Sequence, residues 1–158
     1  MSTTEDRRVE EVRPDPPRGW WDHVERRVGR VAPTVLRVAI GLVFVWFGLL
    51  KVVGESPVAE LVHATLPWVP AAVLLPVLGW FEVALGAALL VGRPWRTTLV
   101  AAGLHLAGTF LVFVQAPDLT WSDGNPLLLT ANGEFVLKNL VLIGAVLMLL
   151  AHDRRATR

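Results

Sequence analysis

The sequence contains no cysteine, and lysine occurs only at positions 51 and 138. The absence of cysteine excludes disulfide bonds, thiol relays and thiolate metal sites within this chain. The sequence also lacks a glycine-rich phosphate loop, a nucleophile elbow and a c-type haem attachment motif. The first 30 residues are charged and rich in proline, with no apolar segment of the signal-peptide type. We therefore expect the first apolar segment to act as an uncleaved signal anchor.

The sequence is instead rich in apolar residues. Of the 158 residues, 53% are hydrophobic, and the mean hydropathy is +0.50. These residues are concentrated in four segments, each close to the ~17–25 residues that a helix needs to cross a hydrocarbon core. The prediction is an all-α, polytopic membrane protein, a four-transmembrane-helix bundle with spans at about 34–53, 71–91, 97–115 and 135–151. The alternative, a soluble four-helix bundle, would need polar helix faces that these segments almost lack.

The distribution of arginine indicates how the spans are oriented. The 13 arginines lie before or at the start of span one, between spans two and three, and after span four, whereas Lys51 and Lys138 lie at the opposite ends of the spans. By the positive-inside rule, both termini and the 92–96 loop are cytoplasmic. This predicts a multi-pass protein of the plasma (inner) membrane, with loops 54–70 and 115–134 facing outward.

The chain outside the spans divides by composition. Trp21, Val24, Val28 and Val31 repeat at helical spacing among arginines, which indicates an amphipathic helix on the membrane surface, with an ordered linker as the alternative. The predicted domains are a disordered cytoplasmic N-terminus at 1–18, an amphipathic interfacial segment at 19–33, a four-helix membrane domain at 34–151 and a cytoplasmic tail at 152–158.

The two outer loops carry different signals. Residues 58–66 predict a short helix along the outer surface. The second loop, 117–133, contains several turn residues, and we expect it to cap any outward-facing site, with 127–129 packed back against the bundle.

Six ionisable side chains lie inside the spans or at their ends: Arg37, Lys51, Glu82, His105, Glu134 and Lys138. Placing Arg, Lys or Asp at the centre of a membrane helix costs roughly 2.5–3.5 kcal/mol on insertion scales. Such residues therefore usually face the protein interior and often mark a site. They indicate where a function is located but do not identify a reaction.

In span one, two glycines lie on the same helix stripe as the two charges. Gly41 and Gly48 share a face with Arg37 and Lys51, and small residues allow a neighbouring helix to approach closely. Lys51 therefore either faces inward or extends its charge to the outer interface. Arg37 lies near the inner end, where we expect it to act as an anchor.

Glu82 and His105 lie near the middle of spans two and three. Gly79 and Gly86 flank Glu82 on one face, and a carboxylate at that depth must be protonated, paired or hydrated. If Glu82 and His105 meet, they could carry a proton to or from a bound substrate. The alternatives are a structural buried pair for Glu82 and a hydrogen-bonded packing residue for His105.

Glu134 and Lys138 are four residues apart at the outer end of span four. They could form a local helix pair worth only ~0.2–0.5 kcal/mol. Alternatively, they join Lys51 around the outer mouth of a polar cavity, above Glu82 and His105. No metal site is predicted, because Glu82 and His105 supply only two ligands.

Three short motifs occur in order along the spans: Arg37, Gly41, Phe44, Gly48 and Lys51 in span one, Gly79-Trp80-Phe81-Glu82 with Gly86 in span two, and residues 132–139 (NGEFVLKN) at the start of span four. Together they resemble the helix signatures of DoxX family membrane proteins (DoxX/DoxD-like), near the branch of the reactive-chlorine-resistance membrane proteins. The resemblance covers about residues 34–151. Arg37, Lys51, Glu82, Glu134 and Lys138 match these motifs by position, whereas His105 lies outside them.

The resemblance implies a four-helix bundle with a quinone-linked or oxidative-stress role, because some family members resemble a small subunit of thiosulfate:quinone oxidoreductase. In that role Glu82 and His105 are proton-transfer candidates, and the substrate-binding candidates are Lys51, Glu134, Lys138 and Trp80. The chain would carry no intrinsic cofactor, bind quinone, and need a soluble or membrane redox partner. The expected partners also include the lipid bilayer and possible further copies in a homo-oligomer, but no nucleic acid.

Two other functions remain open on the sequence alone. In a non-enzymatic membrane anchor or assembly partner of a redox complex, the buried charges would hold the bundle together. In a small proton-coupled transporter, Glu82 would be the coupling carboxylate, although four-span exporters carry that residue in their first helix.

Overall fold

In the computed structural model of this protein, the residues described are 19–92 and 95–156, and almost all of them are helical. The elements are α1 (Trp20–Val52), α2 (Ala59–Thr65), α3 (Ala71–Val91), α4 (Trp95–Gly108), the 3-10 turn η1 (Thr109–Leu111), α5 (Val112–Gln115), α6 (Pro117–Thr120), β1 (Trp121–Ser122), β2 (Asn125–Leu129), α7 (Ala131–Leu137) and α8 (Asn139–Ala156).

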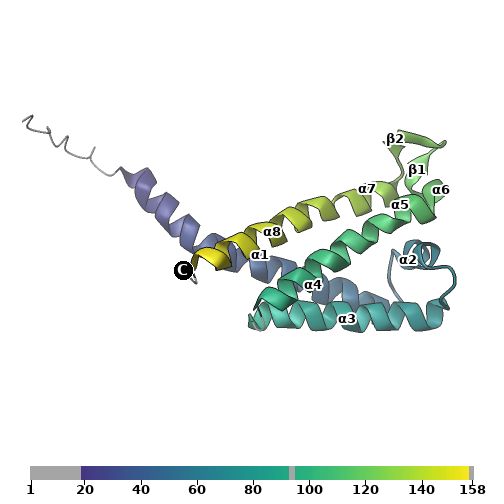
Figure 1. Ribbon diagram of the computed structural model, residues 1–158, viewed down its shortest axis with the longest axis horizontal. Coiled ribbons are helices and arrows are strands. Elements are labelled where there is room, and N and C mark those ends of the chain that lie inside the picture. The colour runs from purple at the N-terminus through teal and green to yellow at the C-terminus, as the bar shows by residue number, and fades with distance from the viewer. Residues whose placement is uncertain (1–18, 93–94, 157–158) are drawn as a thin grey trace, which may run out of the picture.

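Four long apolar helices pack as a bundle, as the sequence predicted (Figure 1). They are long and apolar enough to cross a membrane, and they comprise residues 20–52, 71–91, 96–115 and 131–152. The third consists of α4, η1 and α5, and the fourth of α7 and α8. The buried core links all four, with Phe44, Leu85, Leu99 and Val146 each contributed by a different helix.

Helices α1 and α3 form the tightest pair, and glycine makes this possible. A Cβ added at Gly48 would lie 2.7 Å from the carbonyl oxygen of Gly79, and one added at Gly86 would lie 2.6 Å from that of Gly41. Each helix thus places two glycines, seven residues apart, against the backbone of the other. The prediction that the glycine stripe faces a neighbouring helix is confirmed.

Helix α1 differs from the predicted division at residues 33 and 34. It is continuous through Pro33, so this proline lies inside the helix and not in its first turn. At 33 residues the helix is about 50 Å long, which exceeds the ~30 Å hydrocarbon core. The N-terminal part extends past the bundle (Figure 1), and its place along the membrane surface stays a prediction.

The ends of the bundle separate the connecting segments into two groups. The N-terminal part of α1, the last turn of α3, the first turn of α4 and the last turns of α8 lie at one end, whereas α2, α6 and the β1–β2 hairpin lie at the other (Figure 1). We call the second group the α2 end of the bundle. This grouping is the one that the arginine pattern requires, and which end faces the cytoplasm stays a prediction.

The two connecting segments at the α2 end differ from the roles that the sequence suggested. A short helix occurs where it was predicted, as α2, and it contributes to the cavity described below. The second segment forms a hairpin that turns at Asp123 and Gly124, both with positive φ, at 53° and 69°. Leu127 remains 88% exposed and Leu128 54% exposed. The prediction that 127–129 pack back as a cap is therefore wrong for these two leucines, because pairing of the two strands holds them away from the bundle.

Candidate functional site

Glu82 is the centre of a buried ionic cluster. The Lys51 Nζ atom donates a hydrogen bond of 2.6 Å to Glu82 Oε2, and the His105 Nε2 atom donates one of 2.8 Å to Glu82 Oε1. Both carboxylate oxygens therefore have partners, from two different helices. Lys51 is 5% exposed and Glu82 is 7% exposed. Such mutual pairing offsets much of the cost of burying charge in an apolar surrounding.

The positions of Lys51, Glu82 and His105 on their helices bring the three side chains together. Glu82 lies on the glycine face of α3, between Gly79 and Gly86, and that face packs against α1. Lys51 is in the last turn of α1, and its long side chain reaches toward the middle of α3. The cluster therefore links the closely packed α1–α3 pair to α4, which carries His105.

Two aromatic rings contact the imidazole of His105. The ring centroid of Phe44 on α1 lies 5.8 Å from that of His105, and the centroid of Phe81 on α3 lies 5.6 Å from it. These contacts limit the rotation of the imidazole, which keeps Nε2 directed at Glu82. Because a carboxylate only accepts hydrogen bonds, the contact requires the proton to be on Nε2.

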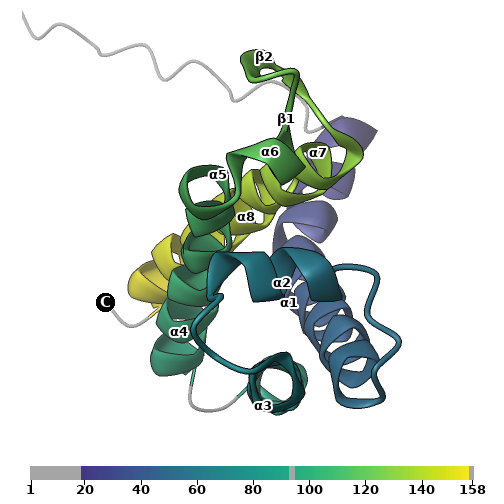
Figure 2. The same cartoon turned by 90° about the vertical axis from the view of Figure 1, so that its right-hand side faces the viewer.

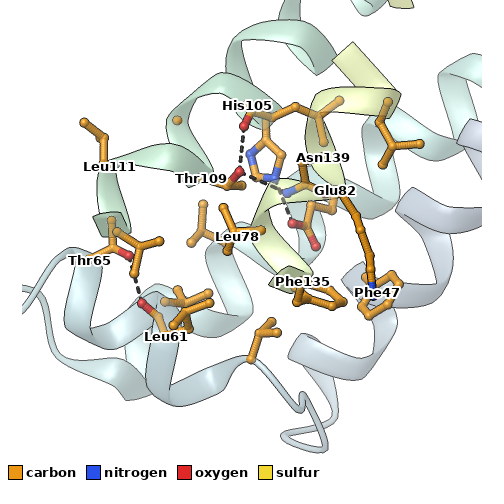
Figure 3. A pocket seen from close by; sticks show the side chains of 18 of the residues that line it. Phe47, Leu61, Thr65, Leu78, Glu82, His105, Thr109, Leu111, Phe135 and Asn139 are labelled. Carbon is orange, nitrogen blue, oxygen red and sulfur yellow. Dashed lines mark hydrogen bonds and ion pairs between the residues drawn. The ribbon is translucent and has the colours of Figure 1, made fainter. Parts of the chain in front are cut away.

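The cluster forms part of the wall of a partly open cavity of about 670 Å³ (Figure 3). This volume is within the range of sites that hold small organic ligands, ~300–1,000 Å³. Most lining side chains are apolar and come from all four spans and from α2, among them Phe47, Leu61, Leu78, Leu111 and Phe135. The polar lining residues are Lys51, Thr65, Glu82, His105, Thr109, Lys138 and Asn139.

The long helices form two pairs, α1 with α3 and α4 with α8, and residues of both pairs line the cavity. Helix α2 also lines it, and Figure 2 shows this short helix lying across one end of the bundle. Leu61 of α2 is buried in a small apolar cluster with Val112 and Val136. This contact joins α2 to the third and fourth spans. A segment outside the spans thereby becomes part of the cavity wall.

The remaining predicted site residues lie in other surroundings. Lys138 lines the cavity but is exposed, whereas Glu134 and Trp80 are exposed and do not line it. Arg37 lies at the other end of the bundle from α2, where its guanidinium contacts Gly92, the residue that ends α3. The structure thus assembles Lys51, Glu82 and His105 and keeps the other four apart from them.

A second polar contact on the cavity wall was not predicted. The Asn139 Nδ2 atom donates a hydrogen bond of 3.0 Å to Thr109 Oγ1, and Thr109 Oγ1 donates one of 2.6 Å to the carbonyl of Leu106. Neutral polar side chains in membrane helices are too common to single out by type. The one available signal was the position of Asn139 at the end of the NGEFVLKN motif.

The described residues include no group of three or more His, Asp or Glu side chains suited to hold a metal ion. The site presents a paired carboxylate, an ammonium and an imidazole. These groups can donate and accept hydrogen bonds, and the carboxylate and imidazole can exchange a proton.

Comparisons with protein-family models, curated proteins and solved structures gave no match to this chain. Helix length, hydropathy and packing decide its class. The chain is a multi-pass membrane protein. Its four apolar helices form the bundle, and its ionic cluster faces a partly open cavity in that bundle.

Proposed function

We propose that this chain is a DoxX-like membrane subunit that binds a quinone in the cavity and acts with a redox partner. One observation supports this best: a cavity of about 670 Å³ has apolar walls and a buried Lys51–Glu82–His105 cluster at one place in them. A quinone combines an apolar ring and tail with carbonyl oxygens that need hydrogen-bond donors. The cavity supplies both environments.

The roles within the cluster follow from its hydrogen bonds. Lys51 has two ammonium protons beyond the one on Glu82, so it can donate to a quinone carbonyl. Conversion of a quinone to a quinol adds two electrons and two protons. In this proposal the protons pass through Glu82 and His105, which share a hydrogen bond, and the two electrons come from the redox partner.

The resemblance to the DoxX family supports the same proposal independently of the cavity. Its motif positions include Lys51 and Glu82, and the structure pairs these two side chains directly. Motif residues that are distant in sequence therefore form one ionic cluster. A plasma-membrane location with cytoplasmic termini belongs to this proposal.

The second candidate function is a non-enzymatic anchor or assembly partner. It is favoured by the surfaces that extend away from the bundle, namely the exposed hairpin leucines 127 and 128 and the N-terminal part of α1. In this case Lys51, Glu82 and His105 serve only to hold the bundle together.

Quinone binding separates the two candidates. We expect the purified protein in lipid nanodiscs to bind a short-tailed para-quinone saturably, and Glu82→Gln to weaken that binding by about tenfold, as expected when a charged hydrogen-bonding group is removed. Glu134→Gln is the matched control, because Glu134 is exposed and lies outside the cavity lining. Absence of quinone binding, or equal affinities in all three proteins, would support the anchor function.

A further inference from the structure

The third and fourth spans are both interrupted where they line the cavity. Helix α4 ends at Gly108 and continues as a 3-10 turn from Thr109, while α7 ends at Leu137 and α8 begins at Asn139. Such breaks at membrane depth are tolerated where they face protein or a cavity, and they often occur at functional sites. Here the residues that begin the next segments, Thr109 and Asn139, both line the cavity.

A hydrogen-bond chain joins these two breaks. Because the Thr109 hydroxyl gives its proton to the carbonyl of Leu106, it can only accept from Asn139. This fixes the orientation of the Asn139 amide, with Nδ2 toward Thr109. One Nδ2 proton and the Oδ1 atom are then left over, and the structure shows no further hydrogen bond for this side chain among the described residues.

The second polar contact lies close to the first. His105 and Thr109 are four residues apart on consecutive turns of the third span, which places their Cβ atoms about 5–6 Å apart in a helix. Figure 3 shows the Thr109–Asn139 contact next to the His105–Glu82 contact on the cavity wall. The cavity therefore presents two hydrogen-bonding positions one helical turn apart, in an otherwise mainly apolar lining.

We propose that Thr109 and Asn139 form a second binding position, which selects ligands with two oxygens on opposite sides of one ring. The nearer oxygen accepts a hydrogen bond from the Lys51 ammonium, and the farther oxygen accepts one from the second Nδ2 proton of Asn139. Asn139 makes the contact, and Thr109 is a positioning residue that orients its amide. This assignment rests on the proposed function and narrows its ligand to a para-quinone, in preference to an ortho-quinone or a ring with one oxygen.

The test compares two ligands on the full-length protein in nanodiscs. One is a short-tailed para-quinone, and the other is a phenol with the same tail and a single ring oxygen. Asn139→Leu retains the branched outline of the side chain and removes the amide. We expect it to weaken para-quinone binding by about three- to tenfold, the size of one hydrogen bond, and to leave phenol binding unchanged.

Thr109→Val and Thr109→Ser complete the comparison. Valine removes the acceptor that orients Asn139 and should weaken para-quinone binding less than Asn139→Leu, whereas serine retains the hydroxyl and should restore wild-type affinity. If Asn139→Leu fails to fold, the valine and serine pair tests the same point.

Each other outcome has a definite meaning. Equal weakening of both ligands by Asn139→Leu would overturn the second binding position, because the contact would then be only structural. An Asn139→Leu variant with unchanged para-quinone affinity would overturn it as well. In either case, quinone binding by the wild-type protein would still support the proposed function. If the wild-type protein binds neither ligand, both proposals fail together.

Discussion

At the scale of single residues, burial cost explains what the sequence could show. Glu82 was recognisable because a short acidic side chain in the middle of a span cannot reach the interface, and it does have two partners. The pairing with His105 was foreseen as a possibility. The direct pairing with Lys51 was not, because the reach of a long side chain from the last turn of α1 cannot be read from residue spacing. Thr109 and Asn139 escaped notice because burying a hydroxyl or an amide costs less than burying a charge.

The Lys51–Glu82 ion pair should show a clear coupling free energy. The test is a double-mutant cycle of Lys51→Met and Glu82→Gln. Each single variant leaves an imperfectly paired buried group, so the double variant should lose less stability than the two single variants lose together. We expect a coupling of about 0.5–3 kcal/mol in the free energy of unfolding, measured by denaturant titration in mixed micelles.

The control cycle uses Glu134→Gln and Lys138→Met, two exposed residues of opposite charge that lie four residues apart. Its coupling should not exceed ~0.5 kcal/mol. Additive losses in the Lys51–Glu82 cycle, or equal coupling in both cycles, would contradict a buried ion pair.

At the scale of elements, apolar length and glycine spacing carried most of the information. The four spans and the short helix at 59–65 were predictable, because each depends on a local run of apolar residues. The β1–β2 hairpin and the continuity of α1 through Pro33 were not, since a two-residue strand gives almost no alternating pattern and a proline usually ends a helix or begins one. The second outer loop was expected to be the cap, but α2 contributes to the cavity wall instead.

The close packing of α1 against α3 gives a prediction at the scale of elements. Gly79→Ala would place a Cβ atom 2.7 Å from the Gly48 carbonyl oxygen and 3.0 Å from the Lys51 Cβ. The helices must separate, so we expect a loss of about 1–3 kcal/mol in unfolding free energy, as for other overpacked sites. Because Lys51 is displaced as well, para-quinone binding should weaken in the same variant.

Gly144→Ala is the matched control on α8, because a Cβ there meets nothing within 4 Å. It should be neutral or stabilise the protein by up to ~1 kcal/mol, through the higher helix propensity of alanine. A Gly79→Ala variant as stable as Gly144→Ala would show that the two helices do not approach closely.

At the scale of the whole molecule, the site depends on how the α1–α3 pair packs against the α4–α8 pair. The pairs meet through the core around Phe44 and Leu99, while the cavity opens between them nearer to α2. No single span contains the site: Lys51, Glu82, His105 and Asn139 come from four different spans. Sequence reasoning could name the first three, but only the packing shows that they face one cavity.

The predicted orientation can be tested by labelling, because the chain has no cysteine of its own. We expect Asp123→Cys, in the exposed hairpin turn, to react with a membrane-impermeant maleimide added to intact cells. His152→Cys, near the opposite end of the bundle, should react only after the cells are permeabilised. The reverse pattern would place the arginine-rich end outside and overturn the cytoplasmic assignment of the termini.

The central claim is that the Lys51–Glu82–His105 cluster forms part of a ligand site. A high-resolution structure of the protein purified in native lipid, with a para-quinone supplied, tests this most directly. We predict ordered, ring-shaped density in the cavity, within hydrogen-bond distance of Lys51 on one side and of Asn139 on the other. A cavity that holds only acyl chains or side chains, with the ionic cluster contacting no ligand, would contradict the claim.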